Sequence, residues 1–267
     1  MKPAAKRLAL CMLALTIIAV LPAYADDWTK TYNLTGKPDL RIDTSDANIH
    51  VSTWDQHSIE ARVTTTRYKI GEGGIQIDEH QNGDSVDIEV RYPHHNFTVD
   101  WGQHRVDINI QMPREGKVNL RTGDGHIDLA GFKGDMTLHS GDGTETLDSV
   151  DGALHASTGD GHIRANGRFD QLDLKTGDGH IEVRANSGSA LGSNWRLETG
   201  DGNVTLQVPH DLAADVNLHT SDGHIDLDIP VTTDGEIREN EIHGKLNGGG
   251  GLLSIHTGDG SIHLMKI

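Results

Sequence analysis

The central feature of the chain is a short alternation of apolar and polar residues around a Gly-rich turn, repeated seven times. Each copy has the form Thr/Ser-Gly-Asp-Gly, with Ser221 replacing the first glycine in one of them. The copies begin at Thr122, Ser140, Thr158, Thr176, Thr199, Thr220 and Thr257. The first four lie 18 residues apart, and the later spacings are 23, 21 and 37 residues. This spacing indicates one repeated unit with loops inserted between the later copies.

Apolar residues keep the same four positions around every turn. They stand four and two residues before the Thr or Ser, and five and seven residues after it, and Glu145 is the one exception. Alternation at period two over such short stretches predicts two short strands per unit, each with one buried face. Such strands bury their apolar face only when units stack. The expected fold is therefore all-β, a single-stranded parallel β-helix (β-solenoid) with about 18 residues per coil.

The same template occurs once more near the N-terminus. Leu40 and Ile42 precede the sequence Thr44-Ser-Asp46, which predicts a first coil at 38–54. Between 55 and 113 the period is lost, although alternating stretches continue and Gln-Asn-Gly-Asp at 81–84 predicts a hairpin turn. Two interpretations stay open for 55–113: irregular coils or inserted hairpins of the same solenoid, or a separate small β domain. We therefore divide the chain into an N-terminal β region, 26–113, and a regular solenoid, 114–267, with an insertion at about 230–250.

Residues 1–25 have the organisation of a signal peptide. Lys2, Lys6 and Arg7 precede an apolar run at 8–21, and Ala-Tyr-Ala at 23–25 supplies small residues at a cleavage site before Asp26. An uncleaved anchor is the alternative, but the run is shorter than the ~20 residues of a membrane span. We expect export to the periplasm, the cell surface or the medium, with no membrane span after cleavage. The single cysteine, Cys11, would leave with the signal, which excludes disulfides and thiolate chemistry.

The composition and net charge of the chain limit the classes of molecule that it is expected to bind. The chain has 40 acidic against 23 basic residues, a net charge of −17, and loss of the signal would make it −20. Nucleic acid and anionic membrane surfaces attract basic proteins, so neither is an expected partner. The hydrophobic content of 35% and the 32 glycines fit a narrow core with many tight turns.

The export signal and the repeated turns between short Val/Ile/Leu strands resemble the bacterial "putative adhesin" domain family. The resemblance covers about residues 38–267 and rests on the seven Gly-Asp-Gly copies that begin at Thr122 to Thr257. It implies a right-handed β-helix, an exported location and no assigned enzymatic activity. It supplies no catalytic residues.

One aspartate recurs two residues after each Thr or Ser. The column consists of Asp46, Asp124, Asp142, Asp160, Asp178, Asp201, Asp222 and Asp259. Stacked carboxylates repel one another unless they are solvated, hydrogen-bonded or bridged by a cation. A Ca²⁺ ladder is one interpretation, with Ca²⁺ as the only candidate cofactor. We favour a structural turn ladder, in which each aspartate accepts N–H bonds from its own turn and the glycines supply positive φ.

Histidines form a second column two residues further on. His162 and His180 fall on adjacent coils and could hold Zn²⁺ or Ni²⁺, but two ligands do not complete a site. His94, His95 and His104 are a second weak metal candidate. We favour a solvated polar face rich in histidine for both groups, and assign no metal.

The first functional hypothesis is a non-enzymatic exported scaffold for interaction or adhesion, binding a protein or a glycan. The alternative is a polysaccharide-acting β-helix lyase or hydrolase, and the third is the Ca²⁺-binding ladder. No catalytic residue is assigned, because short turns of nearly identical sequence make a poor active site. The C-terminal strand at 261–267 has no polar cap, which predicts either self-association through its open edge or cover from the 230–250 insertion.

Overall fold

Strands follow one another along the whole described chain. The computed structural model describes residues 25–93, 105–192, 194–233 and 238–267. The first ten strands are β1 (Ala25–Asn33), β2 (Asp39–Thr44), β3 (Asn48–Trp54), β4 (Ser58–Thr66), β5 (Gln76–Asn82), β6 (Ser85–Arg91), β7 (Arg105–Pro113), β8 (Glu115–Arg121), β9 (Ile127–Ala130) and β10 (Lys133–His139). The others are β11 (Glu145–Thr158), β12 (Ile163–Thr176), β13 (Ile181–Ala185), β14 (Trp195–Thr199), β15 (Val204–Val208), β16 (Ala214–Thr220), β17 (Ile225–Leu227), β18 (Thr232–Thr233), β19 (Glu241–Leu246), β20 (Gly251–Thr257) and β21 (Ile262–Lys266). The prediction of an all-β protein is confirmed for these residues, none of which forms a helix long and apolar enough to cross a membrane.

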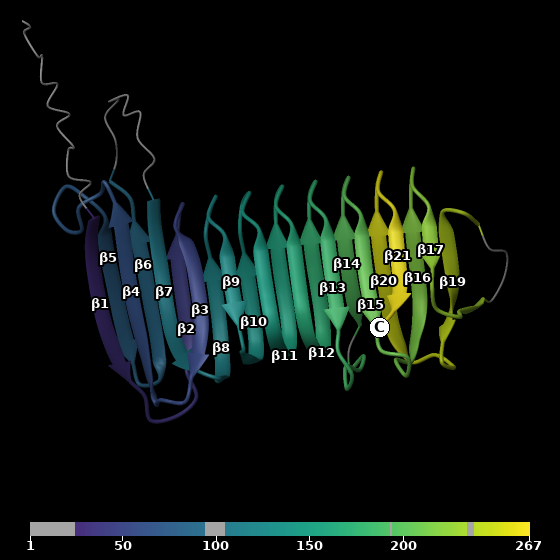
Figure 1. Ribbon diagram of the computed structural model, residues 1–267, viewed down its shortest axis with the longest axis horizontal. Coiled ribbons are helices and arrows are strands. Elements are labelled where there is room, and N and C mark those ends of the chain that lie inside the picture. Colours follow the sequence, from purple (N-terminus) through teal and green to yellow (C-terminus); the bar gives the residue numbers. More distant parts are fainter. Residues whose placement is uncertain (1–24, 94–104, 193, 234–237) are drawn as a thin grey trace, which may run out of the picture.

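The strands pair in two series along the long axis of the molecule (Figure 1). Series A runs β5, β6, β2, β8, β10, the second halves of β11 and β12, β14, β20, β16, β19 and β18. Series B runs β1, β4, β7, β3, β9, the first halves of β11 and β12, β13, β15, β21 and β17. From β8 to β13 the pairs are parallel and offset by 18 residues, as in Val118 opposite Met136 and Ile163 opposite Ile181, except for 150–152 of β11, where the register shifts by one residue. A unit is hereafter one strand from each series joined by a Gly-rich turn, such as β8/β9.

The buried side chains of both series form one continuous core cluster. The four apolar positions predicted around each turn are at most 4% exposed in every unit except β16/β17, where Ile225 and Leu227 are half-buried. The intervening side chains on the strands point outward and are mostly polar. Period-two alternation therefore identified the core.

The Gly-rich turns stack on one another through backbone hydrogen bonds. Gly141 N donates to Gly123 O at 2.5 Å, and Gly159 N donates to Gly141 O at the same distance. The expectation of positive φ at these glycines is wrong, because none of them has a positive φ. Glycine is required there for another reason: a Cβ on Gly179 would clash with the carbonyl oxygen of Gly161 in the unit below.

The chain does not add its units in sequence order at the N-terminal end. The unit β2/β3 lies between β6/β7 on one side and β8/β9 on the other. β5 and β6 form an antiparallel hairpin around Gly83, which has a φ of +62°, as the sequence at 81–84 predicts. β4 pairs antiparallel with both β7 and β1. Residues 55–113 therefore turn back over the outer side of β2/β3.

The C-terminal end is also out of order. The last unit, β20/β21, lies between β14/β15 and β16/β17, and Figure 1 shows its yellow strands among green ones. The predicted open edge at 261–267 is wrong, because β21 pairs with β15 on one side and with β17 on the other. The insertion covers β16 instead, through the antiparallel strand β19.

Candidate functional site

A shallow groove crosses five neighbouring strands of series B. It has a volume of about 630 Å³ and lies on the outer side of β4, β7, β3, β9 and β11. Its outward side chains are His50, Ser52, Glu60, Arg62, Thr64, Asn109, Gln111, Asp128, Ala130, Thr146 and Asp148. All but Ala130 are polar, because each stands at the outward position of a strand whose alternate residues fill the core.

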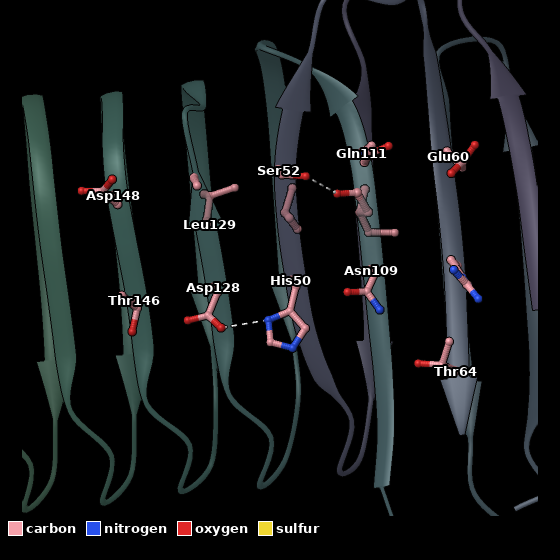
Figure 2. A pocket seen from close by; sticks show the side chains of 14 residues that line it. His50, Ser52, Glu60, Thr64, Asn109, Gln111, Asp128, Leu129, Thr146 and Asp148 are labelled. Atoms are coloured by element: carbon pink, nitrogen blue, oxygen red, sulfur yellow. Dashed lines mark hydrogen bonds and ion pairs between the residues drawn. The ribbon is translucent and has the colours of Figure 1, made fainter. Parts of the chain in front are cut away.

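The strand register aligns these side chains across the groove. Arg62, Asn109, His50, Asp128 and Thr146 stand opposite one another on successive strands. Figure 2 shows Asn109, His50, Asp128 and Thr146 at the same level of the sheet. Hydroxyl, amide, carboxylate and imidazole groups therefore follow one another at the strand spacing of about 4.8 Å.

His50 has a carboxylate beside each of its two ring nitrogens. Its Nδ1 lies 2.8 Å from Asp128 Oδ2, and its Nε2 lies 3.7 Å from Asp107 Oδ1. Asp107 also accepts hydrogen bonds from Asn48 Nδ2 at 2.9 Å and Arg105 Nε at 2.8 Å. These contacts fix the orientation of the imidazole, so it is preorganised to contact a ligand in the groove.

Ser52 carries the hydroxyl group nearest to His50 along β3, and this hydroxyl does not hydrogen-bond to the imidazole. Ser52 Oγ donates to the backbone oxygen of Ile110 at 3.3 Å, as the dashed line in Figure 2 shows. Nucleophilic catalysis needs a hydroxyl within hydrogen-bond reach of a base. In the structure the Ser52 hydroxyl is hydrogen-bonded to the backbone and not to His50.

The aspartate column lies on the exposed side of the stacked turns. All eight carboxylates predicted for it are exposed, and in the described residues none of them makes a hydrogen bond or an ion pair. The expected acceptor role belongs to the buried Thr/Ser hydroxyl instead. Thr176 Oγ1 donates to Gly161 O at 2.8 Å and accepts from Gly179 N at 3.2 Å. The same pattern recurs at Ser140, Thr158, Thr199, Thr220 and Thr257. Cation binding by the column stays a prediction.

The histidine column forms a ladder with the backbone. His162 Nδ1 accepts a hydrogen bond from His180 N at 2.9 Å, and His180 Nδ1 accepts one from Asn203 N at 2.8 Å. The His162 and His180 rings stack with their centroids 5.0 Å apart. Desolvation, with His180 and Arg164 nearby, lowers the pKa of the His162 imidazole. The structure thus gives these side chains a structural contact, and metal binding by the pair stays a prediction.

The second metal candidate, His94, His95 and His104, lies outside the described residues, as do Cys11 and the predicted signal peptide up to residue 24. Within the described ranges, no three His, Asp or Glu side chains are grouped so that they could hold a metal ion.

A family model matches residues 39–265, described as Toastrack DUF4097. The chain belongs to the Toastrack family. No curated protein matches its sequence. Solved structures similar to this Toastrack chain include a putative cell adhesion protein from Clostridium sporogenes, with 13% identity, 91% of this chain and 100% of the other covered, and a TM-score of 0.44. A putative adhesin from Bacteroides fragilis shares 13% identity over 90% of this chain and 97% of its own, with a TM-score of 0.49. A putative lipid binding protein from Parabacteroides distasonis shares 14% identity over 91% and 98%, with a TM-score of 0.46.

The Toastrack chain also carries two features that sequence reasoning missed. The groove depends on β7 lying between β4 and β3, and no repeat marks that arrangement. Glu145 was noticed as the exception to the apolar rule, yet its side chain is fully buried between Ile127 and Ile163 of the adjacent strands. Neither carboxyl oxygen has a hydrogen-bond partner.

Burial of the Glu145 carboxyl raises its pKa to about 8. The backbone amide of Ser140 acts in the opposite direction, but its N–H already donates to Ser157 O at 3.0 Å. Glu145 is therefore mostly protonated at neutral pH, which makes it a structural irregularity of the core and not an ionised site.

Proposed function

We propose that this protein is an exported, non-enzymatic scaffold of adhesin type, and that the groove over β4, β7, β3, β9 and β11 binds a glycan. The observation that carries the proposal is the row of outward polar side chains aligned across those five strands. The scaffold itself is proposed to be a parallel β-helix with about 18 residues per coil, which fits the 18-residue offsets between paired strands.

The chemistry of the groove favours a glycan over a protein partner. The central part of a protein interface is usually apolar and aromatic. Among the outward side chains of this groove only Ala130 is apolar. A hydroxyl-rich partner that keeps part of its hydration is better matched to amides, hydroxyls and carboxylates.

The rigidity of the strands supports the same proposal. Binding costs less conformational entropy when the contacting side chains stand on a fixed framework. His50 is held by Asp128 and Asp107, and Asn109 lies beside it in the middle of the row. These residues present donors and acceptors without any rearrangement of the backbone.

A glycan array with two matched variants tests the proposal. Asn109→Leu removes an exposed amide from the groove, and Asn119→Leu removes an exposed amide from β8 in series A. Neither amide makes a hydrogen bond within the described chain, so both variants should fold. We expect the wild-type protein and Asn119→Leu to retain the same glycans and Asn109→Leu to lose them. Equal retention by both variants would contradict the groove as the site.

The same array distinguishes the enzymatic alternative. A lyase would release unsaturated uronate products, and a hydrolase would release new reducing ends. We expect every retained glycan to remain intact after prolonged incubation. Products that form with the wild-type protein and disappear with His50→Ala would assign catalysis to the groove and overturn the non-enzymatic function.

A further inference from the structure

The last unit of the chain fills an interior position that units earlier in the sequence leave open. β14 and β15 pair with β20 and β21, with Trp195 opposite Leu253 and Val204 opposite Ile262. The other side of β20 and β21 pairs with β16 and β17. Residues 251–267 are therefore a strand pair that enters between two units already present in the chain.

The strand pairing and turn contacts of this unit are made with residues before it in the sequence. Leu253, Ile255, Ile262 and Leu264 are at most 1% exposed. Thr257 Oγ1 donates to Gly202 O at 2.7 Å, and Thr220 Oγ1 donates to Gly260 O at 2.7 Å. None of these contacts requires that the unit be covalently continuous with the strands on either side of it.

The open position is selective for a unit of this repeat. A Cβ on Gly260 would clash with Gly202 O, and a Cβ on Gly223 would clash with Gly260 O. An occupant therefore needs glycine at this point of its turn, together with the buried Thr and the four apolar positions. A second copy of the chain carries such a unit.

A strained, glycine-rich hinge connects the last unit to the rest of the chain. Asn247, Gly248 and Gly249 have φ values of +48°, +87° and +89°. The hinge passes around the end of β16, since Leu246 and Gly251 both stand opposite Ala214 on its two sides. Left-handed backbone costs most non-glycine residues energy, and asparagine less than the others, so the strain at Asn247 is small. Short hinges under strain favour exchange of the segment that they connect.

We propose that the unit β20/β21 is exchangeable, so that two copies of the protein can swap residues 251–267 and each fills the open position of the other. Such a dimer would keep the contacts that the unit makes in the monomer and release the hinge in both copies. The dimer would present two copies of the groove over β4, β7, β3, β9 and β11 to a partner, whereas the monomer presents one.

A hinge variant measures the exchange. Nothing lies within 4 Å of a Cβ on Gly248, so Gly248→Val acts only through the positive φ of the closed hinge. The extended hinge carries no such strain. We expect analytical ultracentrifugation to show about a hundredfold rise in the association constant over the wild-type value. Valine at a positive φ disfavours each closed hinge by about tenfold, and the formation of one dimer opens two hinges. Gly83→Val is the matched control, since Gly83 has a φ of +62° and equal space but lies in the β5–β6 turn. It should lower stability and leave the association constant at the wild-type value.

Cross-linking between two different copies keeps the test independent of that variant. Arg196 on β14 stands opposite Ser254 on β20. Arg196→Cys and Ser254→Cys, each with Cys11→Ser, are unfolded, mixed, refolded and oxidised. Exchange predicts a disulfide-linked heterodimer, and the control mixture of Arg164→Cys with Glu182→Cys, from the adjacent strands β12 and β13 outside the exchanged unit, should form no disulfide between copies.

Two results would overturn the proposal. One is the absence of a disulfide between the Arg196→Cys copy and the Ser254→Cys copy after refolding of the mixture. The other is a Gly248→Val association constant equal to the wild-type value.

Discussion

Replacement of Glu145 by Gln should make the protein less sensitive to alkaline pH. The carboxyl of Glu145 is fully buried without a hydrogen-bond partner, and its pKa is raised to about 8 from an ordinary value of 4.5. Between these two pH values the folded protein binds a proton at this site that the unfolded chain has already lost. The free energy of unfolding must therefore fall as pH rises through this range, and the loss is complete only above pH 8.

The magnitude follows from the size of the shift. Each pH unit between about 5 and 8 removes about 1.4 kcal/mol of stability, so the wild-type protein loses about 3 kcal/mol on going from pH 5 to pH 7. Glu145→Gln has nearly the same shape and no charge to lose. Glu145→Ile, which restores the residue type of positions 127, 163 and 181, should be more stable than the wild-type protein at every pH above 5.

The assay is urea unfolding of the wild-type protein and both variants at pH 5, 6, 7 and 8. Other groups titrate equally in all three proteins, so the difference in unfolding free energy isolates Glu145. We expect the advantage of Glu145→Gln to increase by about 1.4 kcal/mol per pH unit. Glu239→Gln, at an exposed carboxyl, is the control and should follow the wild-type curve. Parallel curves for wild type and Glu145→Gln would refute the reasoning.

Three other predictions concern the turns and the columns beside them. Thr176→Val should lower the free energy of unfolding by about 1–3 kcal/mol, because it leaves Gly161 O and Gly179 N buried without their partner, and chemical denaturation measures this. Folding lowers the pKa of the His162 imidazole, so the neutral ring stabilises the folded protein above the ordinary histidine pKa. This stabilisation is lost as pH falls below that value, because the ring then gains a proton more readily in the unfolded chain. His162→Asn, which keeps an acceptor for His180 N as Asn203 does in its own unit, should reduce that loss in thermal melts from pH 7 to pH 5, and an unchanged melting profile would count against it. Titration with Ca²⁺ at near-physiological salt should give no heat and no rise in Tm, and a saturable heat would instead assign the aspartate column to cation binding.

Period-two alternation was sufficient to predict the core and the strand content. The same pattern could not predict the order of the units. Every unit carries the same apolar positions, so this pattern does not show whether β16/β17 or β20/β21 pairs with β14/β15. The predicted C-terminal edge failed for this reason. The turns do differ at one residue, because a Cβ on Gly258 would clash with Gly200 O and β16/β17 has Ser221 at the corresponding position.

The groove escaped prediction for a related reason. The outward direction of His50 and Asn109 follows from alternation, but their proximity depends on residues 55–113 returning to the outer side of β2/β3. Because β3 and β7 are far apart in the sequence and no repeat links them, the sequence pattern does not predict that they pair. The aspartates drew attention as a repeated motif, whereas the hydroxyls beside them hold the turns together, because Thr is buried and Asp is exposed.

Hydrogen exchange of the protein with and without a glycan retained on the array is the most direct test of the proposed function. We expect slower exchange in β3, β7 and β9, no change in β8, β10 and β14 of series A, and recovery of the intact glycan. Protection confined to series A, or cleavage of the glycan during the measurement, would contradict it.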